Sequence, residues 1–201
     1  ILAEAAPASG ELIYTHHERG FSLLSMRTPR ITRLYLQCAP DEDIANWSDD
    51  RIWLELHRRN ADADGLRLNE GPILQKGITP MRSFVAEPMR HGRLFLMGDA
   101  AHIVPPTGAK GLNLAINDVR VFADAVTAFY GHGRTDLLDA YSATCLARVW
   151  RVQHFSWWMT SMLHRFPQAG AFEQRLQLSE LAFVTSNAAA ARALAENYVG
   201  L

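Results

Sequence analysis

Residues 93–113 constrain the fold of this chain more than any other segment. They read RLFLMGDAAHIVPPTGAKGLN: a short apolar strand at 94–97, a stop at Gly98 and Asp99, a Pro/Gly-rich loop, and a helix start. A strand that leads through a glycine-rich loop into a helix N-terminus presents backbone N–H groups to an electron-rich ligand. The carboxylate at the strand end can accept hydrogen bonds from a sugar or ribityl chain. We expect the ligand site here.

The composition supports a packed core and argues against two kinds of partner. The 201 residues are 48% hydrophobic, and 20 basic residues nearly balance 21 acidic ones. No global field therefore attracts nucleic acid or an anionic membrane surface. No apolar run approaches the ~20 residues that span a bilayer. We expect a small-molecule ligand, no nucleic acid and no membrane.

The cysteines and histidines indicate neither a disulfide framework nor a metal site. Cys38 and Cys145 are isolated in the sequence, which favours a reduced, cytoplasmic setting. The histidines include one adjacent pair, His16 and His17, and no Cys/His metal-ligand spacing occurs. We expect no metal.

Residues 11–38 are predicted to form a β-meander, with strands at 12–16, 21–27 and 31–38. Alternate side chains of a strand share one face. In the three strands that face carries Leu12, Tyr14 and His16; Phe21, Leu23, Ser25 and Arg27; and Ile31, Arg33, Tyr35 and Gln37. The mixture fits neither a plain exposed face nor a plain core face.

Arg27 on this face is a candidate receptor for a carboxylate. Ser25 lies two residues before it, and Arg33 and Tyr35 are related in the same way on the next strand. A guanidinium binds a carboxylate bidentately, and neighbouring hydroxyls can add hydrogen bonds. A solvated sheet face with a surface ion pair is the alternative at this point.

The remaining chain reads as one extended segment and four helices. A helix capped by Ser48 runs to about residue 60, and residues 73–86 are extended. Further helices are predicted from the loop to Tyr130, over 135–166 with Thr135 as N-cap, and over 171–198. Their expected apolar faces are Ala115, Val119, Phe122, Val126 and Phe129 in the first of these, and Leu138, Tyr141, Cys145, Val149, Val152, Phe155, Met159, Met162 and Phe166 in the long one.

The loop before the first of these helices is stiff and open to a ligand. Pro105 and Pro106 fix the backbone, so the Pro106 carbonyl is an acceptor that cannot easily turn away. Gly108 and Gly111 allow close approach, and the first helical N–H groups lie at a positive helix end. That end suits a ligand that becomes anionic, such as a phosphate or a reduced isoalloxazine. Alternatively, Asp99 is an ordinary turn carboxylate and His102 a buried imidazole.

The string GRLFLMGDAAHIVPPTGAKGLNLA closely resembles the second FAD-binding motif of the class A aromatic-ring flavoprotein monooxygenases. Within that family, members that hydroxylate 4-hydroxybenzoate are the most similar. Matching blocks run along the whole chain: Tyr14, Ser25, Arg27, Arg33 and Tyr35 in the meander, then RSFVAEP, FSWWMTS, LHRFP and AENYVGL. The resemblance implies FAD and NADPH as cofactors.

The resemblance also implies roles for residues near the flavin. Asp99 would bind the ribityl hydroxyls, and Leu112 and Asn113 would offer N–H groups to the pyrimidine edge. Gly111, at the same helix end, is a further cofactor-binding candidate. Arg33 would lie near the flavin and support its reduction. Arg82 would contribute to the NADPH side.

For the substrate, the resemblance implies a phenol that carries a carboxylate. Ser25, Arg27 and Tyr35 would hold the carboxylate. Tyr14 would bind the phenol, and Tyr198 would relay its proton. The Pro106 carbonyl would face the hydroxyl, with Thr107 beside it. The reaction implied is hydroxylation of 4-hydroxybenzoate to 3,4-dihydroxybenzoate with NAD(P)H and O2; another phenolic acid is the alternative.

The expected fold class is α+β or α/β, as in part of a two-domain flavoprotein hydroxylase whose parts share a cleft. Residues 1–86 would form the substrate-binding sheet region with one helix, and residues 87–201 the C-terminal part of the FAD-binding domain. The family's G-x-G-x-x-G unit is missing. We therefore expect a C-terminal fragment that holds FAD weakly or not at all. A homodimer is implied, and a catalytically incompetent binding or assembly module is the competing interpretation.

Overall fold

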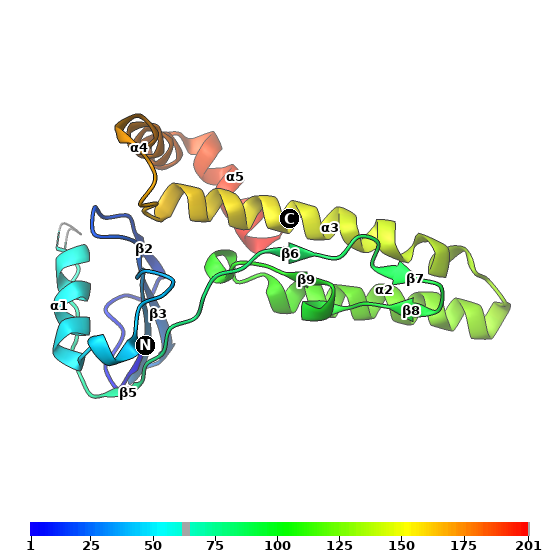
Figure 1. Cartoon of the computed structure of the whole chain (residues 1–201), viewed down its shortest axis with the longest axis horizontal. Coiled ribbons are helices and arrows are strands. Elements are labelled where there is room, and N and C mark those ends of the chain that lie inside the picture. Colours follow the sequence, from blue (N-terminus) through cyan, green and yellow to red (C-terminus); the bar gives the residue numbers. More distant parts are fainter. Residues whose placement is uncertain (62–64, 201) are drawn as a thin grey trace. The chain divides into compact units, whose positions relative to one another are not determined.

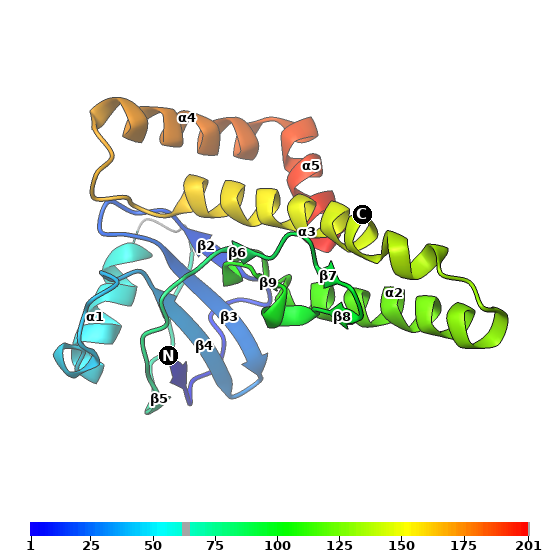
Figure 2. The same cartoon turned by 45° about the vertical axis from the view of Figure 1, so that its right-hand side comes forward.

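The computed structural model describes residues 1–61 and 65–200 and shows a mixed α+β protein, as the sequence predicted (Figures 1 and 2). Its contacts divide it into two compact units. The first, called the sheet unit, comprises Ile1–Pro80 and Ser161–Ser186. The second, called the helical unit, comprises Met81–Thr160 and Asn187–Leu201. The predicted domain boundary after residue 86 stays a prediction.

The sheet unit is built on a five-stranded sheet in the order β2-β3-β4-β1-β5. The expected meander is confirmed as three antiparallel strands, each close to its predicted bounds. The sheet extends beyond it, because the chain start pairs with the third meander strand and with part of the extended segment. The strands are β1 (Leu2–Ala3), β2 (Ile13–Thr15), β3 (Ser22–Thr28), β4 (Ile31–Leu36) and β5 (Ile73–Gln75).

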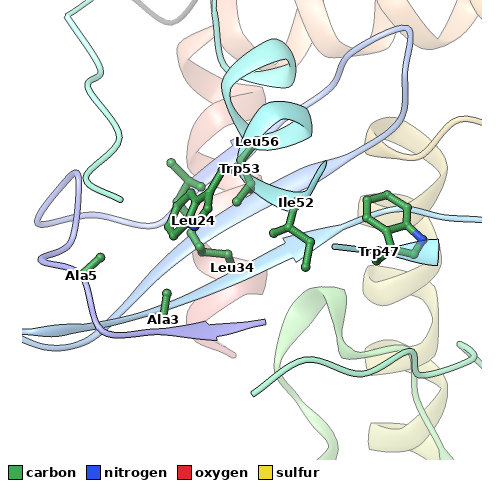
Figure 3. Close-up of a cluster of buried hydrophobic side chains, with 8 residues drawn as sticks. All are labelled: Ala3, Ala5, Leu24, Leu34, Trp47, Ile52, Trp53 and Leu56. Carbon is green, nitrogen blue, oxygen red and sulfur yellow. The ribbon is translucent and has the colours of Figure 1, made fainter. Parts of the chain in front are cut away.

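Helix α1 (Asp49–Arg59) covers one face of this sheet. The predicted cap is confirmed: the Ser48 hydroxyl accepts the Arg51 N–H at 3.2 Å. A short 3-10 turn at Ile44–Asn46 leads into it. Each large apolar side chain buried here contributes about 1.5–3 kcal/mol. The core contains Ala3, Ala5, Leu24, Leu34, Trp47, Ile52, Trp53 and Leu56 (Figure 3).

A buried ion pair ties the end of α1 to the sheet. Arg59, only 4% exposed, donates from Nη1 to the carbonyls of Phe21 and Gln37 at 3.0 and 2.9 Å. Its Nη2 donates to Glu55 at 3.2 Å, and Glu55 also accepts from Nε of Arg19 at 3.2 Å. The pKa of Glu55 is lowered, mainly by the hydrogen bond from Arg19 and also by Arg59.

The segment after the long helix returns to the sheet through one glutamine. The Gln37 side chain donates to the Arg165 carbonyl and accepts the Arg165 N–H at 2.9 Å. It also accepts the Phe21 N–H at 3.0 Å, and the Phe21 ring stacks on His164 with centroids 4.3 Å apart. Helix α4 (Ala171–Ser186) follows in this unit. Residues far apart in the sequence are thus joined by a single amide.

The helical unit is built around α2 (Gly111–His132) and α3 (Asp136–Leu163), which run antiparallel side by side (Figures 1 and 2). Two short hairpin-like pairs lie on them: β6 (Phe84–Val85) with β9 (His102–Ile103), and β7 (Arg90–His91) with β8 (Leu94–Phe95). The last residues of α3 belong to the sheet unit. The helical unit's buried core contains Met89, Ala101, Leu114, Tyr141, Cys145 and Val149.

Some predicted bounds are wrong for identifiable reasons. The strand expected at 94–97 keeps only Leu94 and Phe95, because it pairs with just two residues of β7. The helix expected over 171–198 is two helices, because the Asn187 side chain accepts the N–H groups of Ala189 and Ala190 and starts α5 (Ala188–Val199). The long helix ends at Leu163 rather than Phe166.

The predicted buried face of α2 is partly wrong: Phe122 packs against the core as expected, but Phe129 is 38% exposed. Val119 is 55% exposed, whereas Leu114, Asp118 and Ala125 are buried. The carboxylate of Asp118 lies on the inner face and interrupts the apolar periodicity. The apolar pattern of the sequence therefore predicts burial at neighbouring positions such as Val119. Among the described residues, none of the helices combines the length and apolar character needed to cross a bilayer.

We predict that Glu55→Ala lowers the free energy of unfolding at pH 7 by about 3 kcal/mol, because it leaves Arg59 buried without its carboxylate. Since folding lowers the pKa of Glu55, its contribution is present above the unfolded pKa and is lost as pH falls through the folded one. Urea unfolding at pH 7 and at about pH 3 measures this. The control Asp50→Asn, an exposed carboxylate on the same helix, should change stability by under ~1 kcal/mol. A deficit of equal size at both pH values would contradict the assignment.

Candidate functional site

The sheet face opposite α1 gathers the polar residues that the sequence selected. In the antiparallel register Tyr14 lies opposite Leu23, and Leu23 lies opposite Tyr35. The next row pairs Ser25 with Arg33. Side chains directly opposite each other have Cβ atoms about 4.5–5.5 Å apart. Five of the predicted neighbours are therefore confirmed on one face, three strands wide.

The side chains on this face differ in environment. Ser25 is buried, Tyr14 and Tyr35 are half-buried, and Arg33 is exposed with its guanidinium carbon 5.4 Å from the Tyr35 ring centroid. The Tyr14 ring lies 6.1 Å from that of Phe21. A hydroxyl, two phenols and a guanidinium thus surround an aliphatic centre at Leu23. Such a surface suits an aromatic ligand with a polar substituent.

The position of Arg27 departs from the regular alternation of side chains along β3. The pairing of β3 with β4 shifts between Met26 and Thr28, so Arg27 sits at a β-bulge without a direct partner across the ladder. Its side chain is exposed, and no ion pair of Arg27 occurs within residues 1–61 and 65–200. Bulges re-aim side chains next to binding sites. Arg27 therefore remains available to an anionic ligand.

In the helical unit, the predicted ligand segment folds into two tight turns. The first is a 3-10 turn at Gly98–Ala100, which presents Asp99 to solvent. Gly98 has φ +58°, a conformation that favours glycine. Its N–H donates to Asp118 Oδ2 at 3.0 Å, and its carbonyl accepts the Ala101 N–H at 2.8 Å. Both backbone groups of Gly98 are thus committed to holding the turn.

The second turn covers Pro106–Gly108. The Pro106 carbonyl accepts the Ala109 N–H at 2.9 Å, so it closes the turn in addition to any role toward a ligand. The Thr107 hydroxyl lies 3.0 Å from that of Thr160. Gly108 is packed closely: a Cβ there would lie 3.0 and 3.1 Å from ring atoms of Phe155. The loop is therefore fixed against α3.

The N-terminus of α2 is open. The first intrahelical N–H is that of Leu114, which donates to the Lys110 carbonyl at 3.0 Å. No side chain caps this end, and the N–H groups of Gly111, Leu112 and Asn113 have no hydrogen-bond partner within the described residues. Leu112 is 73% exposed, and a Cβ on Gly111 would meet nothing within 4 Å. Three aligned donors at a positive helix end favour an electron-rich edge.

Tyr198 and Lys110 lie together behind this end. The Lys110 ammonium donates to the Tyr198 carbonyl and lies 5.5 Å from the Tyr198 ring centroid. The pKa of Lys110 is lowered by burial and by the charge of Arg148. The Phe155 ring is 6.1 Å from that of Tyr198. Arg82 is exposed just before β6.

Comparison with known proteins agrees with this geometry. The model of a family described as an FAD binding domain matches residues 1–156. The chain belongs to this FAD-binding domain family. The match covers the meander, the two turns and α2, which carry most of the candidate site residues; Tyr198, on α5 (Ala188–Val199), lies outside it.

Several proteins similar to this chain are named as hydroxylases. The chain is 49% identical over all 201 residues to a p-hydroxybenzoate hydroxylase from Acinetobacter baylyi, and it spans about half the length (50%) of that relative. It is 39% identical over 90 residues, 44% of this chain and 18% of the relative, to an aklavinone 12-hydroxylase from Streptomyces peucetius. A crystal structure of aklavinone-11 hydroxylase with FAD and aklavinone matches 81% of this chain and 32% of its own, with TM-score 0.64 and 26% identity.

The described residues fit the flavin half of FAD. The exposed Asp99 carboxylate can accept ribityl hydroxyls, and the free N–H groups of α2 can donate to the acceptor edge of an isoalloxazine. The absence of a side chain at Gly111 leaves room for that edge. These features agree with the family membership.

Sequence reasoning missed two residues that shape the helical unit. Lys110 was identified only as part of the loop, yet it is a buried cation against Tyr198. Asp118 was not selected at all, although it is fully buried and bonded to Gly98. Its polar character on the inner face of α2 was the available signal.

We predict that Gly108→Ala and Gly111→Ala have opposite effects. Gly108→Ala should destabilise the protein without FAD by about 1–3 kcal/mol, because its Cβ forces the Phe155 ring to move. Gly111→Ala should leave stability unchanged or slightly raised, yet weaken FAD binding severalfold by obstructing the donor edge.

Urea unfolding without FAD and titration with FAD, both on the protein at its full natural length, measure the two effects. Wild-type FAD affinity in Gly111→Ala would exclude a flavin edge at this end of α2. Unchanged stability in Gly108→Ala would show that the Phe155 contact is looser than the structure indicates.

Proposed function

We propose that this protein is a flavin-dependent hydroxylase that converts 4-hydroxybenzoate to 3,4-dihydroxybenzoate with NAD(P)H and O2. The observation that carries the proposal is the 49% identity with p-hydroxybenzoate hydroxylase, which extends over the whole of this chain and therefore over both units. The relative is about twice as long, so the activity is proposed for the protein at full length.

The polar sheet face supports a substrate that is both aromatic and acidic. We assign the carboxylate to Ser25, Arg27 and Tyr35, and the phenol to Tyr14. A guanidinium can hold a carboxylate bidentately, and the half-buried apolar centre at Leu23 suits an aromatic ring. A phenol without a carboxylate would leave Arg27 without its anionic partner. This favours a phenolic acid over a neutral phenol.

The helical unit supplies the cofactor-binding groups. We assign the ribityl hydroxyls to Asp99 and the pyrimidine edge to the N–H groups of Gly111, Leu112 and Asn113. Arg33 would support flavin reduction, and Arg82 would contribute to NADPH binding. Bound FAD would supply the redox chemistry and the activation of O2.

The chain's own residues would prepare the phenol. Loss of the phenolic proton makes the ring carbon next to the hydroxyl electron-rich. The phenol of a free tyrosine has a pKa of about 10, so we assign proton transfer to a relay through Tyr198 rather than to Tyr14 alone. The Pro106 carbonyl and the Thr107 hydroxyl would orient the hydroxyl group.

We extend the proposal to a cytoplasmic homodimer. Free cysteines at 38 and 145 are compatible with a reducing compartment. Exposed apolar side chains on α4, including Phe172 at 72% and Phe183 at 54%, offer a surface that another copy could cover. The division into a substrate-binding region at 1–86 and an FAD-binding region at 87–201 belongs to the same proposal.

The test is substrate-stimulated NADPH oxidation by the full-length protein with FAD. We expect 4-hydroxybenzoate to accelerate NADPH consumption and to yield 3,4-dihydroxybenzoate, detected by chromatography. NADH in a parallel assay identifies the preferred nucleotide. Stimulation only by a different phenolic acid would replace the substrate, and no flavin binding would leave the assembly-module interpretation.

We predict that Arg27→Ala weakens binding of 4-hydroxybenzoate at least tenfold, about 1.4 kcal/mol, because the carboxylate loses its guanidinium. The matched control is Arg30→Ala, an exposed arginine on the same β-hairpin, which should bind substrate as the wild type does. Perturbation of the flavin absorption spectrum by substrate measures both. Equal affinities of the two variants would remove Arg27 from the site.

A further inference from the structure

A buried carboxylate and a buried imidazole lie directly behind the turn that carries Asp99. Asp118 and His102 are 0% and 1% exposed. His102 Nε2 lies 2.6 Å from Asp118 Oδ2, and the same oxygen accepts the Gly98 N–H at 3.0 Å. One oxygen of one side chain therefore joins α2, the Gly98–Ala100 turn and β9.

Besides His102 and Gly98, the Cys145 side chain interacts with the Asp118 carboxylate. The other oxygen, Oδ1, has no hydrogen-bond partner among the described residues. From α3, Tyr141 and Cys145 face the carboxylate. Burial raises the pKa of the Cys145 thiol to about 12, and the Asp118 charge adds to this rise. Burial and the same charge also raise the pKa of Tyr141, whose hydroxyl donates to the Leu96 carbonyl at 2.8 Å.

A buried carboxylate stabilises a core less well than an apolar side chain of similar volume would. Burying a charge costs free energy unless it is hydrogen-bonded, and apolar residues of similar volume often replace buried ion pairs without loss of stability. The residues around it are well able to form an apolar core, since Leu114, Ala101 and Met89 are fully or almost fully buried nearby. The carboxylate therefore contributes something other than packing.

We propose that Asp118 is a positioning residue for the cofactor-binding turn, with His102 as the group that orients its carboxylate. The Gly98 N–H is the only backbone donor that Asp118 holds within the described residues, and Asp99 follows it directly. With its carbonyl bound to Ala101, Gly98 is held from both sides. Its left-handed φ then sets the direction in which Asp99 leaves the turn.

The inference rests on the proposed assignment of Asp99 to the ribityl chain of FAD. It adds a residue, away from the surface, that controls the orientation of that carboxylate. Removal of the Asp118 carboxylate frees the Gly98 N–H, and the turn then samples other orientations before FAD binds. FAD binding must then also order the turn, which costs free energy. The affinity for FAD therefore falls although Asp99 itself is intact.

The experiment compares FAD dissociation constants of full-length variants, measured by quenching of flavin fluorescence. Asp118→Ala should weaken FAD binding about tenfold. Asp118→Asn keeps an oxygen acceptor for the Gly98 N–H and should recover most of that loss. The control Asp124→Asn removes an exposed carboxylate from the same helix and should bind FAD as the wild type does.

A second arm separates this inference from the proposed function. Asp99→Asn should weaken FAD binding at least as much as Asp118→Ala; wild-type affinity in Asp99→Asn would overturn the proposed site and this inference with it. If Asp99→Asn weakens binding while Asp118→Ala does not, the inference alone is wrong. If Asp118→Ala does not fold, the variants His102→Gln and Asp118→Asn provide the test. If His102 orients the Asp118 carboxylate, His102→Gln should bind FAD more weakly than Asp118→Asn. Wild-type affinity for FAD in both variants would overturn the inference.

Discussion

The alternation of side chains along antiparallel strands is the constraint on which the sheet unit depends. Once Leu24 and Leu34 face α1, their neighbours Leu23, Ser25, Arg33 and Tyr35 must point to the other face. A slip of one residue between β3 and β4 would bury the arginine and expose the core. The hydrophobic contact with α1 therefore fixes the polar face as firmly as it fixes the core, so the proposed binding surface depends on the same contact as the stability of the unit.

The helical unit differs from the sheet unit, because the ligand-binding groups proposed for it are mostly backbone atoms. The conformation of the chain places an N–H group, and a side chain can act on it only by holding that conformation, as Asp118 holds Gly98. Two short turns, one closed by the Pro106 carbonyl and one anchored at Gly98, deliver the chain to α2 with its first N–H groups open. Close packing of Gly108 on Phe155 fixes this path. These geometric demands explain Pro106, Gly98 and Gly108.

The sequence predicts those elements whose signals are local. Ser48 as a helix cap, the meander and the buried stripe of α3 follow from capping chemistry and periodicity, and the structure confirms them. Three features depend on tertiary contacts and were missed. The residues around Asn187 favour a continuous helix, so their composition does not reveal the break there. The bulge at Arg27 arises from the pairing of β3 with β4. On α2, the buried Asp118 interrupts the apolar pattern that would mark the inner face.

This last failure has the same origin as the proposed role of Asp118. A residue that departs from the apolar pattern of its helix reduces the sequence signal because it serves a neighbour rather than the core. Periodicity assumes that every inward position maximises apolar burial. Where one inward position instead accepts a backbone N–H from a ligand-binding turn, the pattern must fail there. Local disagreement between periodicity and burial is thus itself evidence for a positioning residue, since a core that needed only stability would have kept the apolar side chain.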